Sequence, residues 1–197
     1  MPRLLLLRHG QSTWNAEERW QGWADPPLSP LGVHQAEDAA RWLVESGTGF
    51  GTVACSDLVR ARRTAEIVAD GLGLGPVEVD PALRERNVGD WEGLTTDEIG
   101  LRWPEALAAW RDRRLRTTPG GEAEPVLVAR ALAGLGRLAA AAPTGGRVLV
   151  VTHGGVIRSL ERHFGLGPGQ VANLCGRWFA FDGHVPVPGE VATYRTV

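Results

Sequence analysis

Short runs of apolar residues along this chain are separated by longer segments in which apolar residues recur at helical spacing. The clearest runs are the four leucines at 4–7 and the Val-Leu-Val-Val sequence at 148–151. A run that is apolar at every position predicts a strand buried on both faces, as in the core of a parallel sheet. The pattern predicts strands at residues 3–7, 52–55, 77–79 and 147–151, and two later strands at 177–182 and 190–194.

Helix start and stop signals mark the segments between the strands. Ser29 and Pro30 suit the N-cap and the first turn of a helix, which Gly47 would end. Ser56 or Asp57 is expected to cap the following helix. The expected helices span residues 30–46, from the cap at 56 or 57 to about 70, 95–101, 104–114, 125–142 and 155–164.

Strands that alternate with helices predict a three-layer α/β/α sandwich with a mainly parallel central sheet. The length of 197 residues suits a single domain, 1–197. The segment from about 94 to 120 is expected to be a small helical insertion that forms part of a lid over the strand ends. The loop at 8–28 is long, polar and aromatic, which is typical of a functional loop, and its tryptophans are candidates for the wall of a substrate pocket.

Composition narrows the expected partners and compartment. The formal net charge is −2, so neither nucleic acid nor a membrane surface is indicated, and a small molecule is expected; a homodimer is compatible with the sequence. Cys55 and Cys175 are far apart and form no CxxC pair, which favours a reducing compartment. No run suits a signal peptide or a membrane span, so a cytoplasmic location is expected.

Arginine and histidine side chains follow three of the predicted strands. Arg8 and His9 end the first strand, Arg60 begins the helix after the second, and His153 ends the fourth. The carboxyl ends of parallel strands lie at one edge of the sheet, where ligands bind, so these side chains are expected to converge. Two arginines and two histidines suit a small, doubly charged anion, and phosphate fits best because guanidinium groups bind its oxygens in a fork.

Further groups around this site support phosphate chemistry. The helix that starts at Gly154 would point its free N–H groups at the anion, and Asn15 would add a neutral donor. A neutral imidazole is a good nucleophile toward phosphorus, and nearby cations disfavour its protonation. We therefore expect His9 to form a phosphohistidine, with Arg8, Arg60 and His153 stabilising the transition state. Two histidines without a carboxylate cluster are too few to hold a catalytic metal, so no metal or other cofactor is expected.

The alkoxide that leaves needs a proton, and the residue pattern leaves its donor open. Glu85 and Glu92 are the main candidates, and Asp57 is a weaker third. Either glutamate could instead be a surface carboxylate that pairs with an arginine.

Blocks of sequence along nearly the whole chain resemble the histidine phosphatase superfamily, which includes cofactor-dependent phosphoglycerate mutases. The similarity is specific because the blocks occur in the order found in the family. They are Arg8–Asn15 (RHGQSTWN), Gln21–Asp25, Leu28–Gly32, Ser56–Ala65, Leu83–Glu85, Gly89–Gly93, Pro119–Glu122 and Thr152–Gly155.

The resemblance implies a metal-independent enzyme in which His9 is phosphorylated and Glu85, rather than Glu92, donates the proton. The residues that it places around the phosphoryl group or the substrate are Arg8, Arg60, His153, Asn15, Gln21 and Gly22. Two positions depart from the family pattern. Ala123 stands where many members have a serine, which removes a helix cap, and Arg86-Asn87-Val88 replaces a segment where an aromatic residue or histidine is common.

Both phosphatases and mutases share the first half of this chemistry. The segment at 95–116 resembles the shorter lid of the phosphatase branch, so we expect a phosphomonoesterase that acts on a small phosphorylated metabolite. The alternatives are a cofactor-dependent phosphoglycerate mutase and a phosphate-binding module without catalytic activity.

Overall fold

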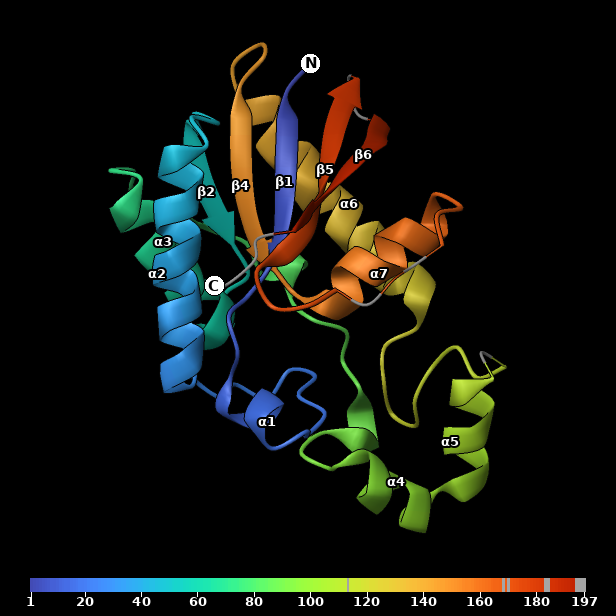
Figure 1. Cartoon of the computed structure of the whole chain (residues 1–197). Helices are drawn as coiled ribbons and strands as arrows, with labels where there is room; N and C mark the ends of the chain where they lie inside the picture. The colour runs from blue at the N-terminus through green and yellow to red at the C-terminus, as the bar shows by residue number, and fades with distance from the viewer. Residues whose placement is uncertain (113, 168, 170, 183–184, 194–197) are drawn as a thin grey trace.

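The computed structural model describes residues 1–112, 114–167, 169, 171–182 and 185–193. In this part of the chain a six-stranded sheet, with the strand order β3-β2-β4-β1-β5-β6, lies between two layers of helices (Figure 1). The strands are β1 (Arg3–Arg8), β2 (Thr52–Cys55), β3 (Glu78–Val79), β4 (Arg147–Thr152), β5 (Cys175–Asp182) and β6 (Val185–Thr193).

Four long helices form the two outer layers. Helices α2 (Pro30–Glu45) and α3 (Val59–Gly71) cover one face of the sheet, and α6 (Glu124–Ala141) and α7 (Gly154–His163) cover the other (Figure 1). The shorter helices are α1 (Thr13–Ala16), α4 (Thr96–Arg102), α5 (Pro104–Arg111) and the 3₁₀ helices η1 (Pro81–Leu83) and η2 (Gly89–Trp91).

The four leucines of β1 explain why helices cover both faces. Leu4 and Leu6 pack into the cluster formed with α6 and α7, whereas Leu5 and Leu7 pack into the cluster formed with α2 and α3. Successive side chains of a strand point to opposite faces, so a strand that is apolar throughout needs a helix layer on each side. This packing confirms the predicted three-layer α/β/α sandwich.

The direction of the strands decides where the site lies. Strands β1, β2, β3 and β4 pair in parallel, while β5 runs antiparallel to β1 and β6 antiparallel to β5. The sheet is therefore mainly parallel, as predicted. The carboxyl ends of its four parallel strands share one edge, and α4 and α5 lie beyond that edge (Figure 1).

The segment 94–120, which we call the lid, is anchored by tryptophans. Trp20, Trp91 and Trp110 meet edge to face, with ring centroids 5.1–5.8 Å apart, and Trp91 is fully buried. Ile99 of α4 and Leu107 of α5 belong to the same apolar cluster. Of the tryptophans in the loop after β1, Trp20 therefore helps to fix the lid.

One predicted helix cap is right and another is wrong. Ser29 accepts a hydrogen bond from the N–H of Gly32 and caps α2, as expected. The N-cap of α3 is Leu58, not Ser56 or Asp57, and its side chain makes no cap. Asp25, from the loop after β1, accepts a hydrogen bond from the N–H of Val59 at 2.6 Å, so a residue distant in sequence supplies the cap.

The ends of the chain's later elements also differ from the pattern. Strand β5 begins at Cys175 rather than at 177, and β6 spans Val185–Thr193 rather than 190–194, of which Tyr194 lies outside the described residues. The pattern missed α1, η1 and η2, which are single turns in segments expected to be loops.

Candidate active site

A cavity of about 740 Å³ opens beyond the carboxyl end of β1, where the lid contributes part of its wall. Eight arginines and three glutamates line it, so the cavity is strongly positive although the whole chain carries a net charge of −2. The arginines are Arg8, Arg19, Arg60, Arg86, Arg111, Arg116, Arg158 and Arg162, and the glutamates are Glu18, Glu85 and Glu124.

His9 lines this cavity and is almost fully buried. Its Nδ1 lies 2.6 Å from the carbonyl oxygen of Gly10, and because a carbonyl can only accept, Nδ1 carries the proton and donates it. The lone pair is therefore on Nε2. Burial lowers the pKa of His9 well below its usual value, and the guanidinium groups of Arg60 and Arg8 lower it further. The ring is thus held neutral, as a nucleophile requires.

Arg8 and Arg60 each have part of the guanidinium fixed by backbone carbonyls. Nη1 of Arg8 donates to Val171 at 2.8 Å, and Arg60 donates to Ala24 at 2.7 Å and to Gly22 at 3.0 Å. The Nε of each arginine is buried and has no hydrogen-bond partner in the described part of the chain. Burial lowers the pKa of Arg60 to about 10, which leaves it charged at neutral pH. Two oriented cationic donors therefore remain for an anion.

His153 lies beside His9, with the two ring centroids 5.1 Å apart. It is fully buried, and neither ring nitrogen has a partner among the described residues. Burial lowers its pKa well below the usual value, and Arg60 and His9 add to this. The predicted convergence of the three strand ends is thus observed. Gly154, at the start of α7, is buried against Arg8, and its contact with a substrate stays a prediction.

The predicted neutral donors also line the cavity. Asn15 accepts a hydrogen bond from the N–H of Ser12 at its Oδ1, and Gln21 accepts one from the hydroxyl of Ser12 at its Oε1. Their amide nitrogens are therefore the groups that can donate to a ligand. Gly22 lines the cavity as well, and its positive φ of 52° suits glycine.

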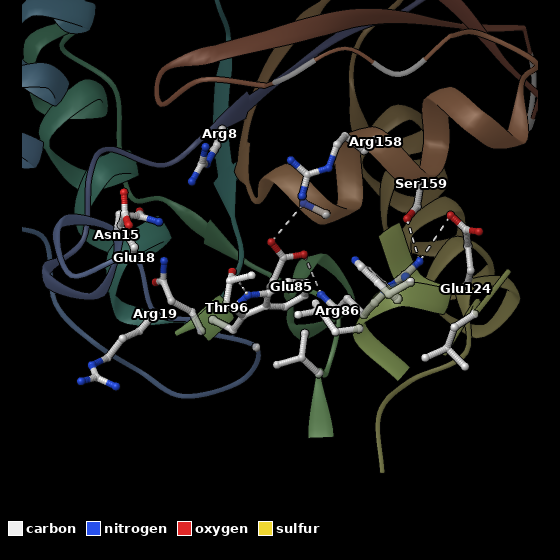
Figure 2. Close-up of a pocket in the computed structure, with 18 of the residues that line it drawn as sticks. Arg8, Asn15, Glu18, Arg19, Glu85, Arg86, Thr96, Glu124, Arg158 and Ser159 are labelled. Atoms are coloured by element: carbon white, nitrogen blue, oxygen red, sulfur yellow. Dashed lines mark hydrogen bonds and ion pairs between the residues drawn. The ribbon is translucent and has the colours of Figure 1, made fainter. Parts of the chain in front are cut away.

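Glu85 lines the cavity, and backbone N–H groups hold its carboxylate. Its Oε2 accepts from Gly155 at 3.0 Å, and its Oε1 accepts from Arg86 at 2.7 Å. A Cβ added to Gly155 would lie 2.0 Å from Oε1 of Glu85, so the carboxylate keeps this position only because residue 155 is a glycine. The first turn of α7 therefore fixes the carboxylate in the cavity that His9 also lines (Figure 2).

The other two carboxylates have structural partners. Oε2 of Glu92 accepts from the N–H groups of Trp23 and Ala24, both at 2.8 Å, and orders the loop that carries Gly22. The guanidinium of Arg84 holds Asp57 by a fork of hydrogen bonds and lowers the pKa of that carboxyl. Neither lines the cavity, so geometry favours Glu85 where the residue pattern leaves three candidates.

Arg130 of α6 fixes the backbone that carries Glu85. It donates to the carbonyls of Ala82, Arg84 and Glu85 at 2.7–2.8 Å. Glu122 accepts from Arg130 at both carboxylate oxygens, at 2.7 and 2.8 Å. Glu122, the last residue of the Pro119–Glu122 block, therefore helps to position Glu85 by holding Arg130.

Several charged residues of the cavity were not predicted as site residues. Arg158, Ser159 and Arg162 lie on one side of α7, and Arg86 and Glu124 face them (Figure 2). The signal was present for α7, because Gly155, Arg158, Ser159 and Arg162 recur at the spacing of one helix face. Arg86 follows Glu85 in a loop, where no periodicity marks it.

No three His, Cys, Asp or Glu side chains gather into a set that could hold a metal ion in the described ranges. Within the same ranges, no helix is long and apolar enough to cross a membrane.

Comparisons with known proteins agree with this geometry. The family model of the histidine phosphatase superfamily (branch 1) matches residues 4–175. A curated relative, the 2,3-bisphosphoglycerate-dependent phosphoglycerate mutase of Methylobacterium radiotolerans, is 40% identical over 180 residues, which make up 88% of this chain and 85% of that protein.

Solved structures with the same fold carry other names. A mycobacterial glucosyl-3-phosphoglycerate phosphatase has a TM-score of 0.80 and 35% identity, covering 90% of this chain and 92% of that one. The alpha-ribazole phosphatase from Shigella flexneri has a TM-score of 0.79 and 27% identity, covering 97% of this chain and 96% of that one. The curated relative is thus named as a mutase, whereas these two similar structures are named as phosphatases.

Proposed function

Because the chain belongs to the histidine phosphatase superfamily, we propose that it is a metal-independent phosphomonoesterase that acts on a small phosphorylated metabolite through a phosphohistidine. The observation that carries this proposal is the state of His9. Its Nδ1 proton is bound by the Gly10 carbonyl, and its Nε2 lone pair lies in a cavity with the buried, unpartnered Nε groups of Arg8 and Arg60.

In the first step Nε2 of His9 attacks phosphorus, and the bond from phosphorus to the ester oxygen breaks. The Glu85 carboxyl donates its proton to that oxygen, so the leaving group departs as a neutral alcohol. Arg8 and Arg60 bind the phosphoryl oxygens, whose charge spreads over them in the transition state. The products of this step are the alcohol, phosphorylated His9 and the Glu85 carboxylate.

In the second step water attacks the phosphohistidine. Glu85 accepts a proton from the water as the new bond to phosphorus forms, and Nε2 of His9 leaves with its lone pair restored. Inorganic phosphate is released, and Glu85 is again protonated. His153 is neutral and lies beside His9, and in this mechanism it contacts the phosphoryl group.

The lid favours a phosphatase, which hydrolyses the phosphoenzyme, over a mutase, which transfers the phosphoryl group back to the bound intermediate. A mutase must keep the phosphoenzyme from water while an acidic intermediate turns over, which favours extra cations in the lid. Among the described lid residues, only Arg111 and Arg116 bring positive charge to the cavity, and both are exposed to solvent.

A phosphoglycerate mutase is the second candidate function, because the curated relatives at 38–40% identity carry that name. The two functions predict different products from the same phosphoenzyme. A phosphatase releases inorganic phosphate without a second substrate. A mutase interconverts 2- and 3-phosphoglycerate when primed with 2,3-bisphosphoglycerate and releases little phosphate.

The test is phosphate release from 4-nitrophenyl phosphate in excess EDTA by the native protein, by His9→Ala and by His34→Ala, an exposed histidine of α2 as matched control. We expect activity in the native protein and in H34A and none in H9A. Activity that EDTA abolishes, or that H9A retains, would contradict the proposal. Interconversion of phosphoglycerates without phosphate release would establish the mutase, and neither activity would favour a binding module.

A further inference from the structure

Residues 171–174 lead directly into β5, which pairs with β1 and lies beside it (Figure 1). We call this segment the clamp. It lies outside the sequence blocks on which the family resemblance rests, and neither step of the proposed mechanism uses it. Three of its four residues nevertheless make hydrogen bonds to Arg8 or His9.

These hydrogen bonds reach both residues of the Arg8-His9 pair. The Val171 carbonyl accepts from Nη1 of Arg8 at 2.8 Å, and the N–H of Leu174 donates to the Arg8 carbonyl at 3.0 Å. Nδ2 of Asn173 donates to the His9 carbonyl at 2.8 Å. The clamp therefore fixes the guanidinium and the backbone of Arg8, and the backbone of His9.

Asn173 supplies a hydrogen bond that the sheet does not. The N–H of His9 donates to the Thr152 carbonyl at 3.0 Å, just beyond the last residue pair of β1 and β4. The His9 carbonyl accepts from the side chain of Asn173. Because a carbonyl can only accept, the amide must present its nitrogen to it. His9 is only 2% exposed, so water is a poor substitute for this donor, and a backbone carbonyl without a donor is costly.

The clamp is anchored in the apolar core on both faces of the sheet. Val171 packs into the cluster formed with α6 and α7, whereas Leu174 packs into the cluster formed with α2 and α3. Between these two anchors, the N–H of Cys175 donates to the Ala172 carbonyl at 3.1 Å and closes a turn. The segment therefore passes from one face of the sheet to the other beside the end of β1.

The backbone of the clamp is strained at one residue. Leu174 has a φ of 55°, which glycine adopts readily and a bulky side chain rarely adopts. Such a conformation persists only where the surrounding structure holds it. The buried side chain of Leu174 and its hydrogen bond to the Arg8 carbonyl provide this support. The turn thus has one defined shape, in which the side chain of Asn173 contacts His9.

The peptide group between His9 and Gly10 is held by side chains at both of its polar atoms. Asn173 binds its carbonyl oxygen, and the hydroxyl of Thr64 accepts from its N–H at 3.1 Å. The next carbonyl, that of Gly10, accepts from Nδ1 of the His9 ring. A rotation of this peptide group would therefore move the acceptor of Nδ1, and Nε2 would move with it. A shift of about 1 Å in a reacting atom can cost two orders of magnitude in rate.

We propose that Asn173 is a positioning residue, which holds the His9–Gly10 peptide group and thereby places Nε2 of His9 for its attack on phosphorus. The backbone of the clamp positions Arg8 in the same way. Asn173 contacts neither the substrate nor a reacting atom, so it acts only through His9. This inference rests on the proposed function, because it names a residue that places the nucleophile of that reaction.

The test measures the rate and the extent of His9 phosphorylation separately. Asn173→Ala is introduced into the Glu85→Gln protein, which is mixed rapidly with excess 4-nitrophenyl phosphate. We expect the rate constant to fall about tenfold, as for one lost hydrogen bond, while the extent still reaches one phosphoryl group per chain. The dissociation constant of inorganic phosphate, measured by calorimetry, should change less than about twofold, because Arg8 and Arg60 keep their bonds to backbone carbonyls.

Two further variants separate positioning from stability. Asn173→Asp has nearly the same shape but no N–H to donate, so it should slow phosphorylation at least as much as Asn173→Ala. Leu138→Ala is the control for stability, because Leu138 is buried in the core about 21 Å along α6 from Glu124, which lines the cavity. It should lower the free energy of unfolding and leave the phosphorylation rate within about twofold of the parent.

A second measurement does not depend on catalysis. Hydrogen exchange of the Gly10 amide reports local opening of the peptide group that Asn173 and Thr64 hold. We expect this amide to exchange about tenfold faster in N173A and less than about twofold faster in L138A.

Phosphorylation at the parental rate in N173A, an equal slowing in L138A, or unchanged exchange at Gly10 would overturn the inference. If the Glu85→Gln protein itself gains no phosphoryl group on His9, the proposed function fails. The exchange of the Gly10 amide then decides alone whether Asn173 holds this peptide group.

Discussion

The two ends of the cavity are built in different ways. At the phosphoryl end, His9, Arg60 and His153 are buried, and backbone carbonyls fix His9 and Arg60 in place. At the other end, between α7 and the lid, the side chain of Arg116 is 70% exposed and that of Arg162 is 31% exposed, and both pair with the side chain of Glu124. The phosphoryl end is thus held by the sheet edge and by backbone groups, whereas the end beside α7 is held by ion pairs between side chains.

This difference predicts different kinetic consequences. Groups that act only on the reacting atoms change kcat, whereas groups that bind substrate and transition state equally change mainly KM. Substitutions near His9 and Glu85 should therefore lower kcat, and substitutions of Arg158 or Arg162, which line the cavity beside α7, should raise KM.

The largest effect is expected at the proton donor. Glu85→Gln removes the proton and should lower kcat about 10²- to 10⁴-fold for an alkyl phosphate such as glycerol 3-phosphate. The loss should be smaller in the first step for 4-nitrophenyl phosphate, whose leaving group needs little protonation. Gly155→Ala should produce the same pattern more weakly, because its Cβ would displace the Glu85 carboxylate. An equal loss with both substrates in the rate of the first step would mean that Glu85 is not the donor.

A smaller effect on kcat is expected from a substitution of Arg130, which positions Glu85. Arg130→Met removes the donor to three carbonyls and leaves Glu122 unpaired, and we expect a loss of about 3 kcal/mol in the free energy of unfolding. The kcat lost should again be greater for the alkyl than for the aryl phosphate.

Arg137→Met is the matched control, since it lies two turns further along α6 and pairs with Asp80 at the surface. Its cost in unfolding free energy should be under about 1 kcal/mol, with kcat unchanged. If both variants lost the same stability and neither altered the dependence on the leaving group, Arg130 would have no role in positioning Glu85.

The protonation of His9 gives a pH-dependent test of the phosphoryl end. Burial, Arg60 and Arg8 lower the pKa of His9, so the neutral ring should persist below about pH 6.5, the usual value for imidazole. Ring ¹⁵N shifts in histidine-labelled protein, assigned with H9A, should report a neutral Nδ1–H tautomer at that pH and below. A midpoint at or above 6.5 would mean that the burial and charges around His9 do not act as described.

The smallest effect is expected at the start of α6, outside both ends of the cavity. Ala123 occupies the N-cap and makes no side-chain cap, so Ala123→Ser should raise the free energy of unfolding by about 1 kcal/mol. Chemical denaturation measures this change, and kcat/KM should stay at the native value. A change in kcat/KM would show that this helix end is coupled to catalysis.

The fold was predictable where one physical signal dominates. The four consecutive leucines of β1 demand two helix layers, and the strand ends then place Arg8 and His9 beside His153. The α3 cap was not predictable, because Asp25 reaches Val59 only in the folded chain. Strand β6 was also predicted too short. Its two prolines disfavour a strand, but β6 lies at the sheet edge, where proline is tolerated.

In the candidate site, too, some residues could be predicted from the sequence pattern and others depend on tertiary packing. The residues that follow parallel strands were predicted together, because the topology brings strand ends to one edge. The residue pattern could not separate Glu85 from Glu92, although the family resemblance favoured Glu85, because the partners of each carboxylate depend on the packing of distant loops. Arg86 carried no periodic signal, since its burial comes from contacts with Trp110 and Ser159.

The most direct test of the central claim is to find the phosphoryl group on His9. Glu85→Gln protein is mixed rapidly with 4-nitrophenyl phosphate, quenched in alkali, in which phosphohistidine survives, and mapped by mass spectrometry. We predict one phosphoryl group on the peptide that contains His9, formed at the rate at which 4-nitrophenolate appears, and none in the H9A variant. Release of 4-nitrophenolate without any phosphoryl group on His9 would contradict the account.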